Sequence, residues 1–180
     1  MKFTEHSRIL AQWIDEKLQP NIYAVGTLKP RRNMWSGNSR SSIWGCEDRY
    51  EAACRQFLCR LTKTVYGKRH WRDNKTLLPC AATLEGNGEG RALRVRPTSE
   101  NHSGLSGTQS GNRLVRYHLN LMFRRPDWIT FEEFQCAIAE GWQKSPWAMP
   151  DIKIEQRLGD CVGYSLKEGP ETLLTSVLSF

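Results

Sequence analysis

The strongest strand pattern in the chain is Tyr117-His118-Leu119-Asn120-Leu121. Successive side chains of a β-strand point to opposite faces of the sheet. The alternation therefore places His118 and Asn120 on one face, whereas Tyr117, Leu119 and Leu121 point to the other. An imidazole and an amide side by side on one face are candidate ligands for a metal ion.

Further elements are predicted on both sides of this strand from apolar periodicity and capping residues. Apolar residues recur at spacings of three and four in the predicted helices, and the strands show alternation or short apolar runs. Thr130 and Glu133 form a capping-box pattern at the start of one helix. In chain order the predicted elements are a helix over 4–18, a strand over 21–29, a helix from Asp48 to a stop at Gly67, strands over 77–85 and 113–123, a helix from Phe131 to about Lys144, a strand over 151–158, and a short helix from about Asp160 to Gly169.

Two connections are predicted to lack regular structure. Residues 30–47 are basic and aromatic together and are predicted to form an irregular loop. Residues from about 94 to 112 are rich in Gly, Ser and Asn, which favours a flexible hairpin loop.

After the first helix, the order of elements is strand, helix, strand, strand, helix, strand. This β-α-β-β-α-β series predicts an α+β fold with a ferredoxin-like or RRM-like antiparallel sheet. The helices are expected to pack on one face of the sheet, and the other face is expected to be open. At 180 residues the chain is predicted to be a single domain spanning 1–180.

Composition favours an anionic partner. The net charge is +7 and the pI is about 9.3, and a basic domain rich in Trp is typical of nucleic-acid binding. No Gly-x-x-x-x-Gly-Lys-[Ser/Thr] phosphate loop occurs in the sequence, which argues against ATP use.

The cysteines and the first residues indicate the compartment. The six cysteines contain no Cys-x-x-Cys pair, which argues against a zinc knuckle or a disulfide framework and favours reduced thiols. Residues 1–18 mix charged and apolar side chains, so they resemble neither a signal peptide nor a membrane span. The sequence therefore predicts a cytoplasmic protein without a membrane partner.

A second pair of candidate functional residues lies on the last predicted helix. Tyr164 and Lys167 are three residues apart, which places a phenol and an ammonium on the same face, one turn apart. A nucleophile and a cation so placed could share one phosphate group.

These residues resemble the motifs of the HUH endonuclease superfamily, in particular the single-tyrosine initiators of rolling-circle replication in plasmids and phages. The segment 23–29 (YAVGTLK) is similar to the family's first motif, a strand of the type apolar-apolar-Thr-Leu-Thr. His118-Leu119-Asn120 is similar to the His-apolar-His motif, and Tyr164 with Lys167 to the Tyr-x-x-Lys motif. The departures are Asn120 in place of the second histidine and the long loop before His118.

The resemblance implies a site and a reaction. Glu85 stands where relatives often have an acidic metal ligand, so Glu85, His118 and Asn120 are the expected ligands. The carboxylate and amide oxygens of Glu85 and Asn120 favour Mg²⁺ or Mn²⁺ over zinc. Tyr164 is the expected nucleophile and would form a 5′-phosphotyrosyl bond, with Lys167 helping to position the phosphate. The expected protein is a site-specific endonuclease and strand transferase.

The expected partner is single-stranded DNA or a DNA hairpin at a replication origin, with a host helicase as a further candidate. Cations mixed with indoles suit phosphate contact and base stacking. Arg124 and Arg125 follow the metal-binding strand and are expected to meet phosphates near the site. The predicted DNA-binding residues are Lys29, Arg31, Arg32, Trp35, Arg40, Arg124 and Arg125.

Other functions fit the same sequence. A transposase or a plasmid-mobilising relaxase would use the same chemistry. A domain that binds single-stranded nucleic acid without catalysis could use the same open sheet, with Asn120 marking a lost metal site. An RNA-binding module is disfavoured, because the central strands lack a Lys/Arg-Gly-Phe/Tyr pattern.

Overall fold

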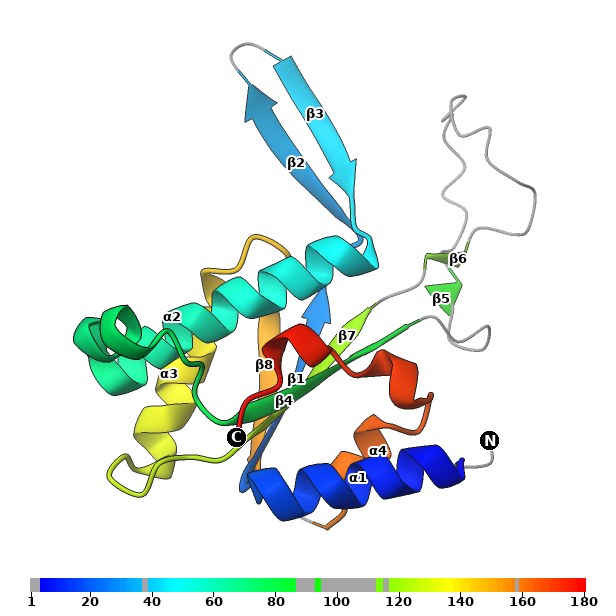
Figure 1. Cartoon of the computed structure of the whole chain (residues 1–180). Helices are drawn as coiled ribbons and strands as arrows, with labels where there is room; N and C mark the ends of the chain where they lie inside the picture. Colours follow the sequence, from blue (N-terminus) through cyan, green and yellow to red (C-terminus); the bar gives the residue numbers. More distant parts are fainter. Residues whose placement is uncertain (1–3, 37–38, 87–92, 95–112, 115–116, 158) are drawn as a thin grey trace.

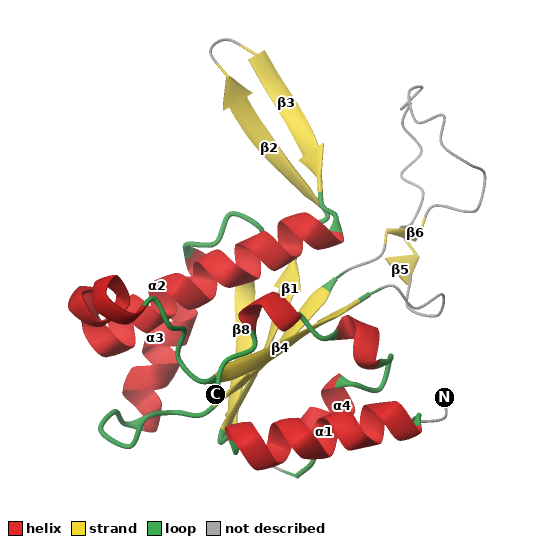
Figure 2. Ribbon diagram, in the orientation of Figure 1, coloured by secondary structure: helices red, strands yellow, loops and turns green. Residues whose placement is uncertain are grey.

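The computed structural model describes residues 4–36, 39–86, 93–94, 113–114, 117–157 and 159–180. It contains both helices and strands (Figures 1 and 2). They are α1 (Glu5–Leu18), β1 (Ile22–Leu28), β2 (Arg31–Ser36), β3 (Ser39–Trp44), α2 (Glu47–Asn74), β4 (Cys80–Glu85), β5 (Leu93–Arg94), β6 (Arg113–Leu114), β7 (His118–Phe123), α3 (Phe131–Gln143), β8 (Ala148–Gln156), α4 (Cys161–Ser165) and two 3₁₀ turns, Pro170–Thr172 and Thr175–Val177.

The central sheet has four strands in the order β4-β7-β1-β8, and each neighbouring pair is antiparallel. Helix α2 connects β1 to β4, and α3 connects β7 to β8. The predicted α+β class and antiparallel sheet are confirmed, and the strand order is compatible with a ferredoxin-like arrangement.

The main hydrophobic core lies between the sheet and helices α2 and α3 (Figure 1). Phe57 of α2 meets Trp142 of α3 edge to face, with ring centres 5.7 Å apart. The Trp142 ring lies directly against the backbone of Gly26, where an added Cβ would be 2.3 Å from Trp142 Cζ2. Glycine is therefore required at this position of β1 by the close approach of the indole.

The opposite face of the sheet is partly covered, which corrects the expectation that helices pack on one face. Ala11 and Ile14 of α1 pack with Val162 of α4 and with Met122 of β7 in a second cluster of buried residues. Figure 1 shows α1 and α4 together on the side away from α2 and α3. The physical reason is that α1 has an apolar face, which is removed from water by packing against the sheet.

The described residues of the segment 30–47 do not form an irregular loop. They contain the β2–β3 hairpin, in which Arg31 pairs with Trp44 and Ser36 with Ser39. The hairpin projects away from the sheet just beyond the end of β1 (Figure 1). Gly37-Asn38, between the two strands in sequence, is a hairpin signal that the prediction overlooked.

Helix α2 is longer than predicted. The backbone of Gly67 is non-helical, with φ +88°, as expected for a residue that ends a helix. The helix nevertheless resumes after Gly67 and continues to Asn74. His70 stacks on Tyr66 across this kink, with ring centres 4.8 Å apart. This contact ties the last turns to the preceding helix.

Two predicted elements differ from the structure, and the other boundaries are close to the predicted ones. The strand predicted over 113–123 corresponds to two elements, β6 and β7, and the last helix, α4, ends at Ser165 rather than near Gly169. Thr4 caps α1, and the capping box of Thr130 and Glu133 starts α3. Strand β8 begins earlier than expected and includes Pro150, which is tolerated because β8 is an edge strand. The flexible loop predicted over about 94–112 lies outside the described residues except for Arg94, which belongs to β5. None of the described helices combines the length and apolar character needed to cross a membrane.

Candidate active site

A cavity of about 330 Å³ opens on the sheet face that carries α4. Strands β1, β4, β7 and β8 and helix α4 all contribute to its lining. The residues that line it are Tyr23, Val25, Glu85, His118, Asn120, Lys153 and Tyr164.

The alternation of β7 places two of the predicted ligands in this cavity. His118 and Asn120 share the cavity face, whereas Leu119 and Leu121 lie in the core with α2 and α3. On the neighbouring strand, Glu85 is the cross-strand partner of His118. The structure thus brings all three predicted metal ligands together, and metal binding by them remains a prediction.

The His118 ring is oriented by β1. Nδ1 of His118 lies 3.1 Å from Oγ1 of Thr27, its cross-strand neighbour, so this hydrogen bond fixes the ring plane. Nε2 is on the opposite edge of the ring from this bond. Metal-binding histidines usually donate their second ring N–H to a carboxylate, a backbone carbonyl or water, and here the Thr27 hydroxyl oxygen occupies the place of that acceptor.

Asn120 is 2% exposed and its amide is held on both sides. The Tyr23 hydroxyl donates to Oδ1 at 2.8 Å, and Nδ2 donates to Oγ1 of Thr83 at 3.2 Å. Burial, and next the nearby Glu85 charge, raise the pKa of Tyr23 to about 12. Tyr23 therefore keeps its proton at neutral pH and acts as a donor to Asn120. A carbonyl oxygen has two lone pairs, so Oδ1 retains capacity for another partner.

Glu85, at the end of β4, is buried and forms an ion pair with Lys167. The Lys167 ammonium lies 2.8 Å from Oε1 of Glu85. The next residues reinforce this contact, because the Glu168 carboxylate accepts a hydrogen bond from the Gly86 backbone amide at 3.3 Å. The segment after α4 is thereby fastened to the end of β4.

Tyr164 is the most solvent-accessible ring in the cavity, with 53% of its surface exposed. Asp160 caps the short helix α4 by accepting a hydrogen bond from the backbone of Gly163. Lys167 lies just past the helix, and its ammonium is 3.5 Å from the centre of the Tyr164 ring. One cation therefore contacts both the predicted nucleophile and a predicted metal ligand.

The donor set fits a divalent ion that prefers oxygen. It offers a carboxylate, an imidazole and an amide oxygen from adjacent strands. Within the described part of the chain, no group of three or more His, Cys, Asp or Glu side chains is placed to hold a metal ion. Glu85 and His118 are the two members of the predicted set that belong to those residue types.

The predicted DNA-binding residues divide between the two ends of the sheet. Lys29, Arg31 and Arg32 lie at the base of the β2–β3 hairpin, close in sequence to Thr27 of the site. Trp35 and Arg40 are cross-strand neighbours near the hairpin's end. DNA contact by these five residues remains a prediction.

Arg124 and Arg125 do not lie near the site, contrary to expectation. They follow the last residue of β7, whereas His118 is the first, and five strand steps separate these ends by about 17 Å. Both side chains have structural contacts: Arg124 donates to the Gln19 carbonyl at 3.2 Å, and Arg125 donates to the Ile129 carbonyl.

Tyr23, Thr27 and Lys153 lie in or beside the cavity but were not among the predicted site residues, although Tyr23 and Thr27 belong to the segment 23–29 that resembles the first motif. The alternation of β1 was a usable signal, because Tyr23, Val25 and Thr27 share one face of that strand. Lys153 lies opposite Val25 on β8 and pairs with Glu155 at 2.9 Å. Comparisons with protein-family models, curated proteins and solved structures gave no match.

Proposed function

We propose that the chain is a metal-dependent, site-specific endonuclease and strand transferase for single-stranded DNA, of the HUH type. The observation that carries the proposal is the convergence of Tyr164 and Lys167 with Glu85, His118 and Asn120 at one cavity. A phenol, a cation and a set of metal-ligating groups are what a tyrosine-dependent phosphodiester transfer needs.

Glu85, His118 and Asn120 would hold Mg²⁺ or Mn²⁺. When bound, such an ion supplies Lewis-acid stabilisation of the charge that develops on the phosphate oxygens. The Asn120 amide carries no charge, so we expect looser metal binding than with two histidines. Thr27 and Tyr23 support this set by orienting the imidazole and the amide.

Tyr164 is the proposed nucleophile, and its exposure suits attack on a strand that enters from solvent. Its phenol oxygen bonds to phosphorus as the bond from phosphorus to the 3′ oxygen breaks. The phenol proton passes to solvent, and the departing 3′ oxygen keeps the bonding electrons and takes a proton from solvent. The products are a 5′-phosphotyrosyl bond and a free 3′-hydroxyl, and the reverse reaction joins strands.

Lys167 would act on the phosphate from the Tyr164 side of the cavity. Its ammonium contacts both the Tyr164 ring and the Glu85 carboxylate. A phosphate bound between Tyr164 and Glu85 would therefore meet a fixed positive charge. A cation at this place opposes the negative charge that builds up during transfer.

Initiation of rolling-circle replication of a plasmid or phage is the proposed biological role, and it rests on the resemblance to single-tyrosine initiators. The DNA would be a single strand or a hairpin at an origin, and a host helicase is a candidate partner. A transposase or relaxase would use the same cavity in the same way. Mapping the nicked sequence on its replicon separates these roles.

A second candidate function is nucleic-acid binding without catalysis. One observation favours it: Lys167 already neutralises Glu85, so the buried carboxylate has a counter-ion without a metal. This alternative predicts salt-sensitive binding and no covalent product.

A covalent-adduct assay tests the proposal. The protein is incubated with Mn²⁺ and single-stranded DNA containing a randomised central segment, and the products are resolved on a denaturing gel. A label at the 3′ end should move with the protein, because the tyrosine keeps the 5′ phosphate of the downstream fragment. A label at the 5′ end should leave with the released 3′-hydroxyl fragment.

Variants make this assay specific. Tyr164→Phe and His118→Ala should abolish the adduct. Tyr23→Phe should still form it, although at a higher Mn²⁺ concentration, because the Tyr23 hydroxyl orients the Asn120 amide and is not the proposed nucleophile. Strong binding on a native gel without an adduct from any DNA pool would instead support the non-catalytic alternative.

A further inference from the structure

Three aromatic side chains lie together near the C-terminal end of α2, which is the end away from the β2–β3 hairpin. The Trp128 ring meets Tyr66 edge to face, with centres 5.3 Å apart, and Tyr66 stacks on His70 at 4.8 Å. Trp128 is 68% exposed, more than any other large apolar side chain among the described residues. A single exposed indole is common, but one built into a ring cluster offers a prepared apolar surface.

The turn that carries Trp128 is held in place by Arg125. Its guanidinium donates to the carbonyls of Pro126 and Ile129, and its backbone amide donates to Oδ1 of Asn21 at 2.7 Å. The Ile129 amide closes the turn by donating to the Pro126 carbonyl at 3.3 Å. The exposed indole is therefore presented on an ordered turn.

Cations accompany these rings. Residues 63–75 contain five Lys or Arg residues and a single acid, Asp73. The Arg69 and Arg72 side chains are largely exposed and share the Asp73 carboxylate at 3.6 and 3.2 Å. Lys63 lies 5.1 Å over the ring of Trp71. Positive charges, which attract phosphates, and exposed aromatic surface thus occur together at this end of α2.

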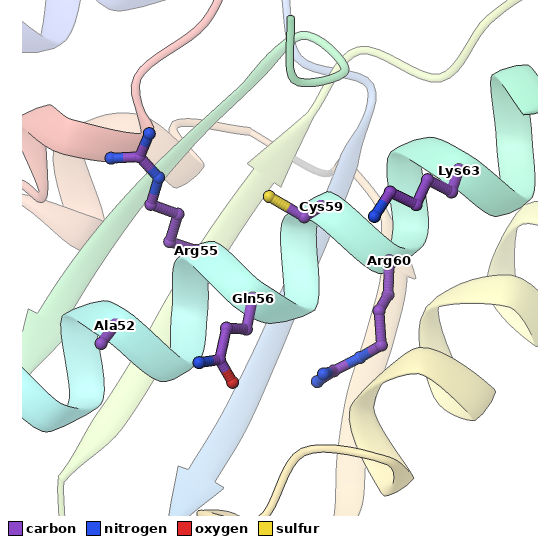
Figure 3. Close-up of a pocket in the computed structure, with 6 residues that line it drawn as sticks. All are labelled: Ala52, Arg55, Gln56, Cys59, Arg60 and Lys63. Atoms are coloured by element: carbon purple, nitrogen blue, oxygen red, sulfur yellow. The ribbon is translucent and has the colours of Figure 1, made fainter. Parts of the chain in front are cut away.

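The positive charge continues along α2. A shallow hollow of about 430 Å³ on this helix is lined by Ala52, Arg55, Gln56, Cys59, Arg60 and Lys63, with no acid among them (Figure 3). Lys63 lines this hollow, and its ammonium also lies over the ring of Trp71 near the end of the helix. We name the rings of Tyr66, His70 and Trp128 with the cations Lys63, Lys68, Arg69 and Arg72 the distal surface.

The distal surface lies at the opposite end of the sheet from the candidate site. Residues 75–79 connect α2 to the first residue of β4, whereas Glu85 is the last. Trp128 similarly follows the end of β7, whereas His118 begins it. The two surfaces therefore cannot share one nucleotide.

We propose that the distal surface binds unpaired nucleic acid, with a base on Trp128 and phosphates on the neighbouring cations. The proposal rests on the proposed nucleic-acid partner and is independent of the nicking chemistry. An exposed ring face accepts any unpaired base, whereas bases in a duplex are already stacked on each other. The strand would extend beyond the site and gain a second point of attachment.

Fluorescence anisotropy with labelled oligothymidylate of about 15 nucleotides tests this proposal. Tyr164→Phe serves as the parent protein and metal is omitted, so that no cleavage occurs. Trp128→Ala should weaken binding about tenfold, and Trp128→Phe, which keeps an aromatic face, should weaken it less. Trp13→Ala is the matched control, because Trp13 is also exposed (41%) and meets Phe180 edge to face.

Salt dependence provides a second readout. The double variant Lys68→Ala and Arg69→Ala should reduce the slope of log affinity against log salt by about 1.4 if both contact phosphates of a single strand. Equal affinity of the Trp128→Ala and Trp13→Ala proteins would overturn the proposal, as would a Trp128 effect confined to duplex DNA or to an acidic polypeptide. Adduct formation at Tyr164 could persist in each of these cases, so failure here is distinguishable from failure of the proposed function.

Discussion

The Lys167 ammonium lies 2.8 Å from the buried Glu85 carboxylate, and this ion pair joins the segment after α4 to the end of β4. The same ammonium rests on the Tyr164 ring. Lys167 therefore holds the proposed nucleophile beside the proposed metal ligands. It also occupies one oxygen that a metal ion would use.

Lys167→Met should make Mn²⁺ binding tighter, on the order of tenfold, because the ion no longer competes with an ammonium for Glu85. Without metal, the variant should lose about 2 kcal/mol of stability. This is less than for a fully buried pair, because Lys167 is 22% exposed. Added Mn²⁺ should then raise the unfolding temperature more in the variant than in the parent.

Lys153→Met is the control for this prediction. Lys153 lines the same cavity, but its ion pair with Glu155 is exposed, so its loss should change stability little. An equal Mn²⁺ effect on the unfolding temperatures of parent and Lys167→Met would show that Glu85 is not a ligand.

Thr27→Val should weaken Mn²⁺ binding by about ten- to a hundredfold, because it removes the hydrogen bond to His118 Nδ1. Isothermal titration calorimetry measures the change. Thr64→Val, which removes an exposed hydroxyl bonded to the Arg60 carbonyl, should leave the affinity unaltered. Equal affinities for the two variants would contradict the role of Thr27.

Gly26→Ala should destabilise the fold by about 1–3 kcal/mol, because the new methyl group would overlap the Trp142 ring. Urea unfolding gives the free energy. Gly141→Ala is the matched control: its Cβ would lie 3.2 Å from Phe57, so a small shift accommodates it. Combining Gly26→Ala with Trp142→Phe should recover part of the loss, and strict additivity would contradict the contact.

Stability should fall as the pH rises from 10 to 12. Burial raises the pKa values of Tyr23 and Tyr50 from 10.0 to about 12, so the unfolded chain releases protons in this range that the folded chain keeps. The stabilising contribution of the two buried phenols is complete below pH 10 and is lost as the pH rises through their folded-state pKa values. Urea unfolding at several pH values should show a shallower decline for Tyr50→Phe, and an unchanged slope would be the contrary result.

Local patterns were sufficient for much of the fold. The alternation of residues 117–121 identified the strand and its polar face, and Thr130 with Glu133 marked the start of α3. These signals depend on neighbours in sequence. The spacing of Tyr164 and Lys167 also anticipated their contact, although the helix ends before Lys167.

The remaining features depend on which strands are neighbours. Tyr23 and Thr27 enter the site because β1 pairs with β7, and Lys153 because β8 pairs with β1. The distance of Arg124 and Arg125 from His118, by contrast, follows from the length of β7 alone and could have been predicted from the sequence. An amphipathic helix such as α1 can be recognised from sequence, but the sheet face that it covers cannot.

The most direct test of the account is to identify the residue that carries the DNA. Adduct formed with Mn²⁺ is digested with protease and nuclease, and the modified peptide is sequenced by mass spectrometry. The account predicts a nucleotide phosphate on Tyr164, absent when His118 is replaced by Ala. A nucleotide on Tyr23 or another residue would contradict the assignment of the nucleophile.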